Sequence, residues 1–143
     1  MRTATSIAVC ICALLLVLPA AAAKEGVRAK LEAGSRLGAA PGTTIAIRWR
    51  LVDANGRAFG ASGIYLRISR CGGGLRRVKA RDLGGGRFSA RVVVPEGGIR
   101  RLRVGLEGWR IPAGGTARRA DMIFEFDPPI ARSCDGRGGA RRG

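Results

Sequence analysis

The sequence predicts an all-β protein, built as a single antiparallel β-sandwich. Three observations predict it: apolar and polar residues alternate with period 2, turn signals recur about every ten residues, and no helical periodicity follows residue 23. The clearest stretch is 87–106, where two alternating runs flank the loop 95–98. Each such strand has one apolar face, so at least one further layer must cover it.

The first 23 residues have the layout of a secretory signal peptide. The start is positively charged, residues 7–18 are an apolar run, and residues 20–23 are alanines that offer small-residue cleavage sites. The apolar run is shorter than the ~20 residues of a membrane-spanning helix. We therefore expect cleavage near Ala22 or Ala23 and no membrane span afterwards, with an uncleaved anchor as the alternative.

Residues 24–134 are long enough for one domain with its own core, and the Gly/Arg-rich tail 135–143 is predicted to be disordered. Cys71 and Cys134 are the two cysteines outside the leader. An even pair in an exported chain indicates one disulfide bond, because the compartment is oxidising. Two unpaired thiols are the alternative.

Seven stretches of the domain qualify as strands. An Asn-Gly turn signal follows the second, basic residues mark the fourth as an edge strand, and prolines at 128 and 129 are expected to end the last. Trp49 and Trp109 are the bulkiest core candidates. The predicted strands are 27–31, 43–52, 63–69, 75–81, 87–94, 102–106 and 121–126.

Six or seven short strands with regular turn signals are typical of an immunoglobulin-like sandwich. The runs 41–44, 48–53, 55–57, 86–90 and 94–95 resemble bacterial secreted Ig-like modules, such as the YtkA-like domains of envelope proteins. The resemblance implies an Ig-like fold and a location outside the cytoplasm, secreted or in the bacterial cell envelope. Some relatives bind metal through histidine or methionine, but this chain has no histidine and only Met122 outside the leader.

Charge is the strongest feature of the composition. Removing Arg2 with the leader leaves 25 basic and 10 acidic residues, a net charge of +15. Such a balance favours contact with anionic surfaces. The alternative is compositional, because Arg, Gly and Ala are the residues that GC-rich codons supply. We expect Arg48, Arg50, Arg87 and Arg91 outward on one sheet, and Arg67, Arg101 and Arg103 outward on the other.

No enzyme class fits the residues that the sequence offers. Without histidine the commonest general base and the usual triads are missing. The ten acidic residues form no recognisable catalytic pair, and two distant cysteines make no metal site. We therefore predict no catalytic residues, no metal and no cofactor.

The sequence favours an exported, non-catalytic binding or structural module of the cell envelope, with an anionic envelope polymer or another envelope protein as its partner. The alternative is an electrostatic binder of anionic polymers or lipid head groups through surface arginines. Nucleic acid is the least expected polyanion, because aromatic residues hardly interleave with the arginines. The simpler hypothesis treats these arginines as a solvated face. The possible polyanion surface comprises Tyr65, Arg67, Arg101, Arg103, Arg118 and Arg119.

Overall fold

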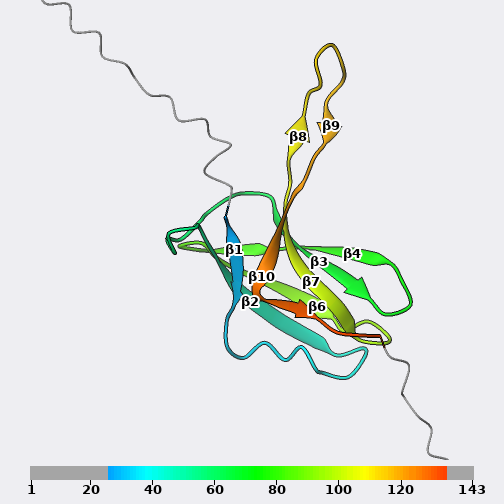
Figure 1. Ribbon diagram of the computed structural model, residues 1–143. Coiled ribbons are helices and arrows are strands. Elements are labelled where there is room, and N and C mark those ends of the chain that lie inside the picture. The colour runs from blue at the N-terminus through cyan, green and yellow to red at the C-terminus, as the bar shows by residue number, and fades with distance from the viewer. Residues whose placement is uncertain (1–25, 135–143) are drawn as a thin grey trace, which may run out of the picture.

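The computed structural model describes residues 26–134, which form ten strands and no helix (Figure 1). The predicted signal peptide 1–23 and the predicted tail 135–143 lie outside the described residues. The all-β prediction is confirmed. The strands are β1 Arg28–Leu31, β2 Thr44–Val52, β3 Ile64–Arg70, β4 Leu75–Lys79, β5 Arg81–Gly84, β6 Arg87–Val93, β7 Ile99–Leu106, β8 Trp109–Arg110, β9 Arg118–Arg119 and β10 Met122–Ala131.

Eight of these strands form one mixed sheet in the order β4-β3-β7-β10-β1-β2-β6-β5, and β8 pairs with β9 in a separate hairpin. The β1–β10 pair is parallel, and the other pairs of the large sheet are antiparallel. The edge strands β4 and β5 are consecutive in the chain, with Ala80 alone between them. The sheet therefore curls until its edges meet at Ala80, as a nearly closed barrel.

The Ig-like sandwich of six or seven strands is not confirmed. Strand β1 pairs with β2 on one side and with β10 on the other, so hydrogen bonds join the two expected layers into one sheet. The strand count is higher because stretch 75–81 divides at Ala80 and because a hairpin forms at 109–119.

The core lies inside the curled sheet, and alternation along the strands fills it. Along β2 the side chains of Ile45, Ile47, Trp49 and Leu51 are buried, whereas the residues between them are exposed. Strand β6 repeats this pattern opposite β2, and Trp49 stacks on Phe88 with ring centroids 6.0 Å apart. The outward alternates therefore carry the arginines, as period 2 predicts.

Two expectations about the end of the chain are wrong. The last strand does not end at the prolines, because its pairing with β7 resumes at Ile130 and Ala131 after an irregularity that begins beyond Glu125. Trp109 is not a core residue, since its side chain is 70% exposed on the projecting hairpin. Trp49 is fully buried, as predicted.

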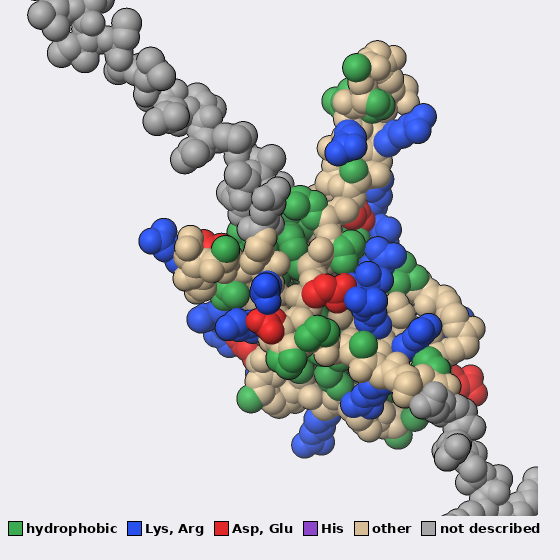
Figure 2. Space-filling view, viewed as in Figure 1, with side chains coloured by type: hydrophobic (Ala, Val, Ile, Leu, Met, Phe, Trp, Pro, Cys, Tyr) green, Lys and Arg blue, Asp and Glu red, His purple; other side chains and the backbone are tan. Residues whose placement is uncertain are grey.

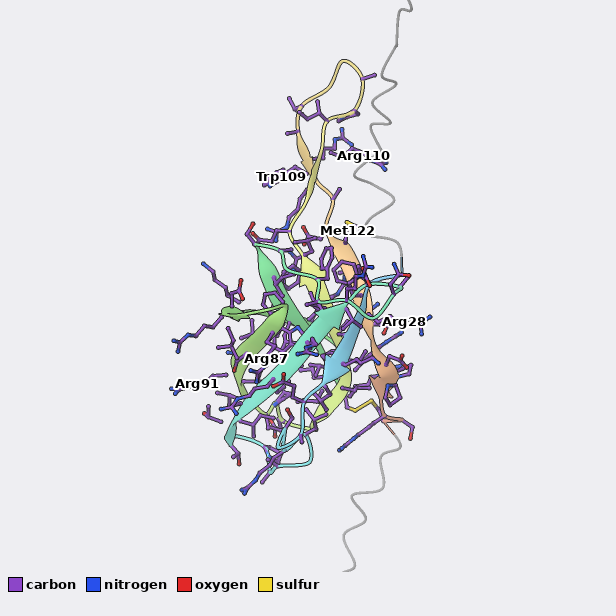
Figure 3. The ribbon with its side chains drawn as sticks, turned by 90° about the vertical axis from the view of Figure 1, so that its left-hand side faces the viewer. Arg28, Arg87, Arg91, Trp109, Arg110 and Met122 are labelled. Carbon is purple, nitrogen blue, oxygen red and sulfur yellow. A yellow bond between two sulfur atoms is a disulfide. The ribbon has the colours of Figure 1, made fainter. Side chains whose placement is uncertain are left out.

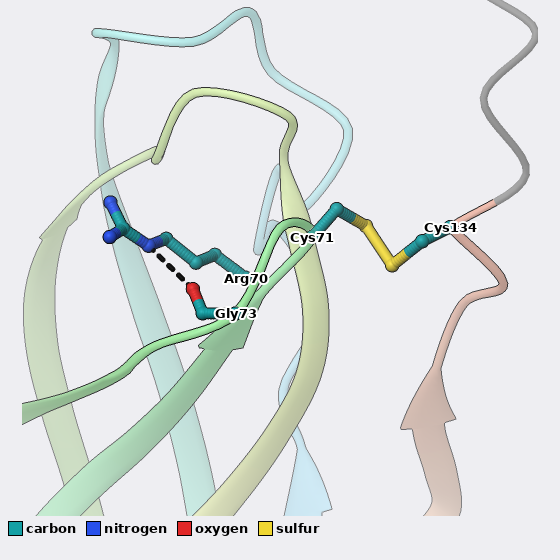
Figure 4. Close-up of a disulfide and its surroundings, with 4 residues drawn as sticks. All are labelled: Arg70, Cys71, Gly73 and Cys134. Carbon is teal, nitrogen blue, oxygen red and sulfur yellow. Dashed lines mark hydrogen bonds between the residues drawn. A yellow bond between two sulfur atoms is a disulfide. The ribbon is translucent and has the colours of Figure 1, made fainter.

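The disulfide prediction is confirmed. Cys71 follows the end of β3 and Cys134 follows β10, and the bond joins them with their Cα atoms 5.5 Å apart (Figure 4). Beside it, the Arg70 Nε donates a hydrogen bond of 2.7 Å to the Gly73 carbonyl. The bond thus ties the end of β10 to the turn between β3 and β4.

Candidate anion-binding site

The predicted polyanion surface divides between two places. Arg67 on β3 and Arg101 and Arg103 on β7 point outward from adjacent strands, as expected. Arg118 and Arg119 lie on β9, in the hairpin beyond the other end of these strands. The six residues therefore do not form one compact site.

Tyr65 lies on the outer face of β3, but its side chain is only 4% exposed. Its ring covers Gly105 of β7, where any Cβ would overlap the ring. The Arg77 guanidinium lies over the ring at 5.1 Å, and the hydroxyl donates a 2.6 Å hydrogen bond to Asp121. Burial and the Asp121 carboxylate raise the pKa of Tyr65. The tyrosine is thus a structural residue, and it cannot stack on a ligand without moving.

Beside Tyr65, four donors converge on the carboxylate of Asp121. The Tyr65 hydroxyl, the Arg119 guanidinium and the Gly108 amide all donate hydrogen bonds to it, at 2.6, 2.9 and 3.3 Å respectively. Arg77 adds an ion pair of 3.0 Å. These donors, the Tyr65 hydroxyl first, lower the pKa of Asp121 to about 2. Arg77 and Arg119 are therefore already paired with a carboxylate.

The other end of the face has a small cleft of about 330 Å³, the Ser69 cleft. Its lining includes Arg101 and Arg103, and both approach one carboxylate oxygen of Glu125, at 2.9 and 3.7 Å. The complete lining is Ser69, Arg100, Arg101, Arg103, Ala131 and Arg132. Glu125 thus neutralises part of this cleft.

Arg67 stands between Arg77 and Arg103 across the ladder of β4, β3 and β7. Like charges directly opposite one another on a sheet repel. Its Nε is buried and finds no hydrogen-bond acceptor among residues 26–134. The three arginines therefore crowd positive charge between the two acidic residues, Glu125 and Asp121.

A second cleft, of about 400 Å³, opens on the other side of the barrel over β2, β6 and β5, and we name it the Ser89 cleft. Ser89 on β6 lies opposite Arg48 of β2 on one side and Arg81 of β5 on the other. Arg91 and Lys79 also line the cleft. Within residues 26–134, none of these four cations has an ion pair.

Arg87, at the border of the Ser89 cleft, differs from these four. It forms a bidentate pair with Glu32, with distances of 2.7 and 3.1 Å (Figure 3 labels Arg87 and Arg91). The Arg87 guanidinium lowers the pKa of Glu32, and Glu32 in turn raises the pKa of Arg87. The carboxylate thus occupies Arg87 and leaves the centre of the cleft without an acidic residue in its lining.

The Ser89 cleft can bind an oxyanion. Guanidinium groups donate paired hydrogen bonds to phosphate and carboxylate oxygens, and a serine hydroxyl adds a further donor. The four cations are exposed, so a polymer can reach them from solvent. Figure 2 shows basic side chains scattered among acidic and apolar ones, and the net positive charge of the chain adds a broad positive field around the local clefts.

The alternation along the strands predicts Arg48 and Arg91 on an outer face but assigns them to no site. Lys79 and Arg81 join them only because the chain bends at Ala80 and carries Arg81 to β6. The alternation predicts which residues face outward, but not that β5 pairs beside β6. Pairing between distant edges is a property of the topology, so local patterns could not reveal it.

A wider hollow, about 620 Å³, opens between β4 and the end of β6 at the incomplete edge of the barrel. Apolar Ile68 and Val94 line it, and Glu96 accompanies Arg70 and Arg76. The mixed charge of this lining fits an anion less well than the Ser89 cleft does. We therefore place the candidate site at Ser89 although its volume is smaller.

Within residues 26–134, no three His, Cys, Asp or Glu side chains lie together as a metal site would require. The same residues contain no helix long and apolar enough to cross a membrane. No protein-family model matches the chain, and the comparison with curated proteins finds no match.

Proposed function

We propose that this protein is an exported, non-catalytic module of the cell envelope that binds anionic groups of an envelope polymer through the Ser89 cleft. One observation carries the proposal: four cations line one cleft together with Ser89, and none of them has an ion pair within residues 26–134. The relationship to secreted Ig-like modules and the location outside the cytoplasm belong to the same proposal.

The chemistry that would be recognised is a repeating phosphate or carboxylate. The cleft is open and its cations are exposed, which suits one unit of a long polymer better than an enclosed small molecule. Binding of this kind releases counterions, so affinity must fall steeply as the salt concentration rises.

The first test is co-sedimentation of the full chain with envelope fractions across a salt series. A basic protein of matched Lys and Arg content sets the baseline. We expect retention above this baseline at low salt, with a steep decline as salt rises. Soluble polyphosphate and polyglutamate, added as competitors in separate arms, identify whether phosphate or carboxylate is preferred.

A matched pair of variants makes the test specific to the cleft. Arg48→Gln with Arg91→Gln removes two charges from the Ser89 cleft, whereas Arg36→Gln with Arg57→Gln removes two exposed charges elsewhere. We expect the first pair to lose most of the retention above baseline and the second to lose little. Equal losses would make the charge a general property of the surface and would contradict a local site.

A further inference from the structure

The hairpin of β8 and β9 stands apart from the barrel and projects into solvent (Figure 1). Its residues 108–120 include one tryptophan, one isoleucine and three arginines, and no acidic residue. Between the strands, residues 112–117 carry small or apolar side chains apart from Thr116. The hairpin is thus a cationic arm with a weakly polar tip.

The base of the arm is held firmly against the barrel. Arg119 donates hydrogen bonds of 2.9 Å to both Glu107 and Asp121. The Ala120 amide donates to the Gly108 carbonyl at 2.8 Å, and a Cβ at Gly108 would overlap the Ala120 carbonyl oxygen. These contacts fix the point at which the hairpin leaves the barrel, so the hairpin projects from the barrel in a defined direction.

The arm carries the two most exposed large apolar side chains among residues 26–134. Trp109 is 70% exposed and Ile111 is 73% exposed, whereas Leu75, the next, is 45% exposed. Large apolar side chains that remain in water at one place mark an interaction site. Tryptophan in particular favours the interface between water and lipid, where its ring is partly buried and its N–H stays hydrated.

The charges of the arm are equally unusual. Arg110 and Arg118 lie directly opposite each other in the hairpin, and neither has an ion pair within residues 26–134 (Figure 3 labels Trp109 and Arg110). Like charges at paired positions repel and destabilise a hairpin. A surface that presents many negative charges would relieve this repulsion for both arginines at once.

We propose that the β8–β9 hairpin docks on an anionic lipid bilayer, with Trp109 and Ile111 entering the interface and Arg110 and Arg118 contacting lipid phosphates. Trp109 and Ile111 lie on one face of the hairpin and Arg110 and Arg118 on the other, because neighbouring residues of a strand point to opposite faces. The narrow arm therefore enters the interface tip first, which brings both faces to the level of the head groups and needs no complementary pocket. Arginines contact anionic head groups while neighbouring apolar side chains enter the interface. The inference uses residues outside the Ser89 cleft and does not depend on the proposed function.

The test uses fluorescence of the full chain with vesicles of phosphatidylglycerol and phosphatidylcholine in equal parts. The chain has two tryptophans, and Trp49 is fully buried, so the signal that Trp109→Phe removes reports on the hairpin alone. We expect a blue shift of Trp109, quenching by brominated lipid, and protection from iodide in the water. Vesicles of phosphatidylcholine alone should give at least tenfold weaker binding.

Two variants separate the contributions of charge and apolar surface. Arg110→Gln with Arg118→Gln should weaken insertion about tenfold or more, because each basic residue near an anionic surface contributes separately. Ile111→Ser should reduce the blue shift. The controls are Arg36→Gln with Arg57→Gln for charge and Leu75→Ala for an exposed apolar side chain, and both should leave insertion unchanged.

Residues 1–25 contain no tryptophan, so adsorption of the full chain through its apolar run cannot produce the Trp109 signal. If the chain sediments with vesicles while Trp109 stays accessible to iodide, the proposal is wrong. Equal insertion by the hairpin and control variants would also overturn it. Because vesicles without polymer test the arm, and a soluble polyphosphate without lipid tests the Ser89 cleft, either proposal can fail alone.

Discussion

The Ser69 and Ser89 clefts are built alike but differ in charge balance. In each, a serine on an outer face lies across the ladder from an arginine, Arg101 in one and Arg48 in the other. At Ser69 the neighbouring strand β10 supplies Glu125, which pairs with Arg101 and Arg103. Neither lining contains an acidic residue. Glu125 pairs with two of the four arginines of the Ser69 cleft, whereas Glu32 pairs with one of the five cations of the Ser89 cleft.

The difference shows that an outward arginine has two possible roles on this fold. On the face of β3, β7 and β10, Glu125 pairs with Arg101 and Arg103, whereas Arg67 and Arg100 have no ion pair within residues 26–134. On the face of β2, β6 and β5, Arg87 is the cation that pairs with a carboxylate, and the four other cations of the Ser89 cleft remain available for an external anion. The first arrangement should matter chiefly for stability and the second chiefly for binding.

The greatest change should be in the free energy of unfolding, and it should come from Asp121, which pairs with arginines next to β3 and β7. Asp121→Asn removes the charge that accepts from Tyr65, Arg77 and Arg119, so the free energy of unfolding should fall by about 2 kcal/mol. Urea denaturation measures it. Arg48→Gln with Arg91→Gln should leave the unfolding free energy within about 0.5 kcal/mol, and an equal loss there would contradict the division of roles.

The same carboxylate makes stability depend on acidity. The pKa of Asp121 is lowered to about 2 from an ordinary value of 3.8. The charged form is thus favoured in the folded state, so its stabilisation is complete above the ordinary value and is lost as the pH falls through about 2. Thermal denaturation between pH 5 and pH 2 should show a decline that is smaller in Asp121→Asn. If stability declined with falling pH by the same amount in both proteins, Asp121 would not be the cause of the decline.

A smaller effect is expected from removing two of the positive charges of the Ser89 cleft. Arg48→Gln with Arg91→Gln should weaken polyphosphate binding about tenfold and reduce the steepness of its salt dependence. Fluorescence anisotropy of a labelled polymer measures both quantities. Arg101→Gln with Arg103→Gln should have a clearly smaller effect, because Glu125 already pairs with those guanidinium groups.

Removing the Glu125 carboxylate should make the Ser69 cleft more like the Ser89 cleft. Glu125→Gln should release Arg101 and Arg103 and strengthen polyphosphate binding about threefold, since exposed ion pairs are worth less than ~1 kcal/mol each. Competition with the labelled polymer detects a change of this size. Unchanged binding would mean that the Ser69 cleft lacks the geometry for an anion even without its carboxylate.

The smallest effect concerns the serine hydroxyls. Ser89→Ala removes one hydrogen-bond donor at the centre of the cleft and should weaken binding about twofold, whereas Ser69→Ala should change it little. The same anisotropy assay, at low salt, resolves the difference. If Ser69→Ala weakened polymer binding more than Ser89→Ala did, the Ser69 cleft and not the Ser89 cleft would be the binding site.

The inward and outward sides of the long strands could be predicted because burial follows period 2, and β2 and β6 alternate as expected. The single curled sheet could not be predicted, since the parallel pairing of Ala29 with Phe126 joins opposite ends of the domain. Local patterns also misplaced Trp109: a large apolar residue after a strand is normally buried, and only the projecting hairpin exposes it.

The candidate site shows the same limit. Arg48 and Arg91 could be identified as outward residues, but their grouping with Arg81 depends on the bend at Ala80. Tyr65 belongs to the predicted polyanion surface, but it is buried because Gly105 leaves room beneath its ring and Arg77 covers it. Neither neighbour is adjacent in the chain, so the burial of Tyr65 depends on strand pairing.

The most direct measurement is an NMR titration of the arginine Nε–H signals with inorganic phosphate at low salt. We expect the signals of Arg48, Arg81 and Arg91 to shift together with the Ser89 amide, at lower phosphate concentrations than those of Arg101 and Arg103. Arg36 and Arg57 should shift least, as exposed loop arginines. If all arginines shift together with the same weak dependence, the Ser89 cleft is not a local binding site.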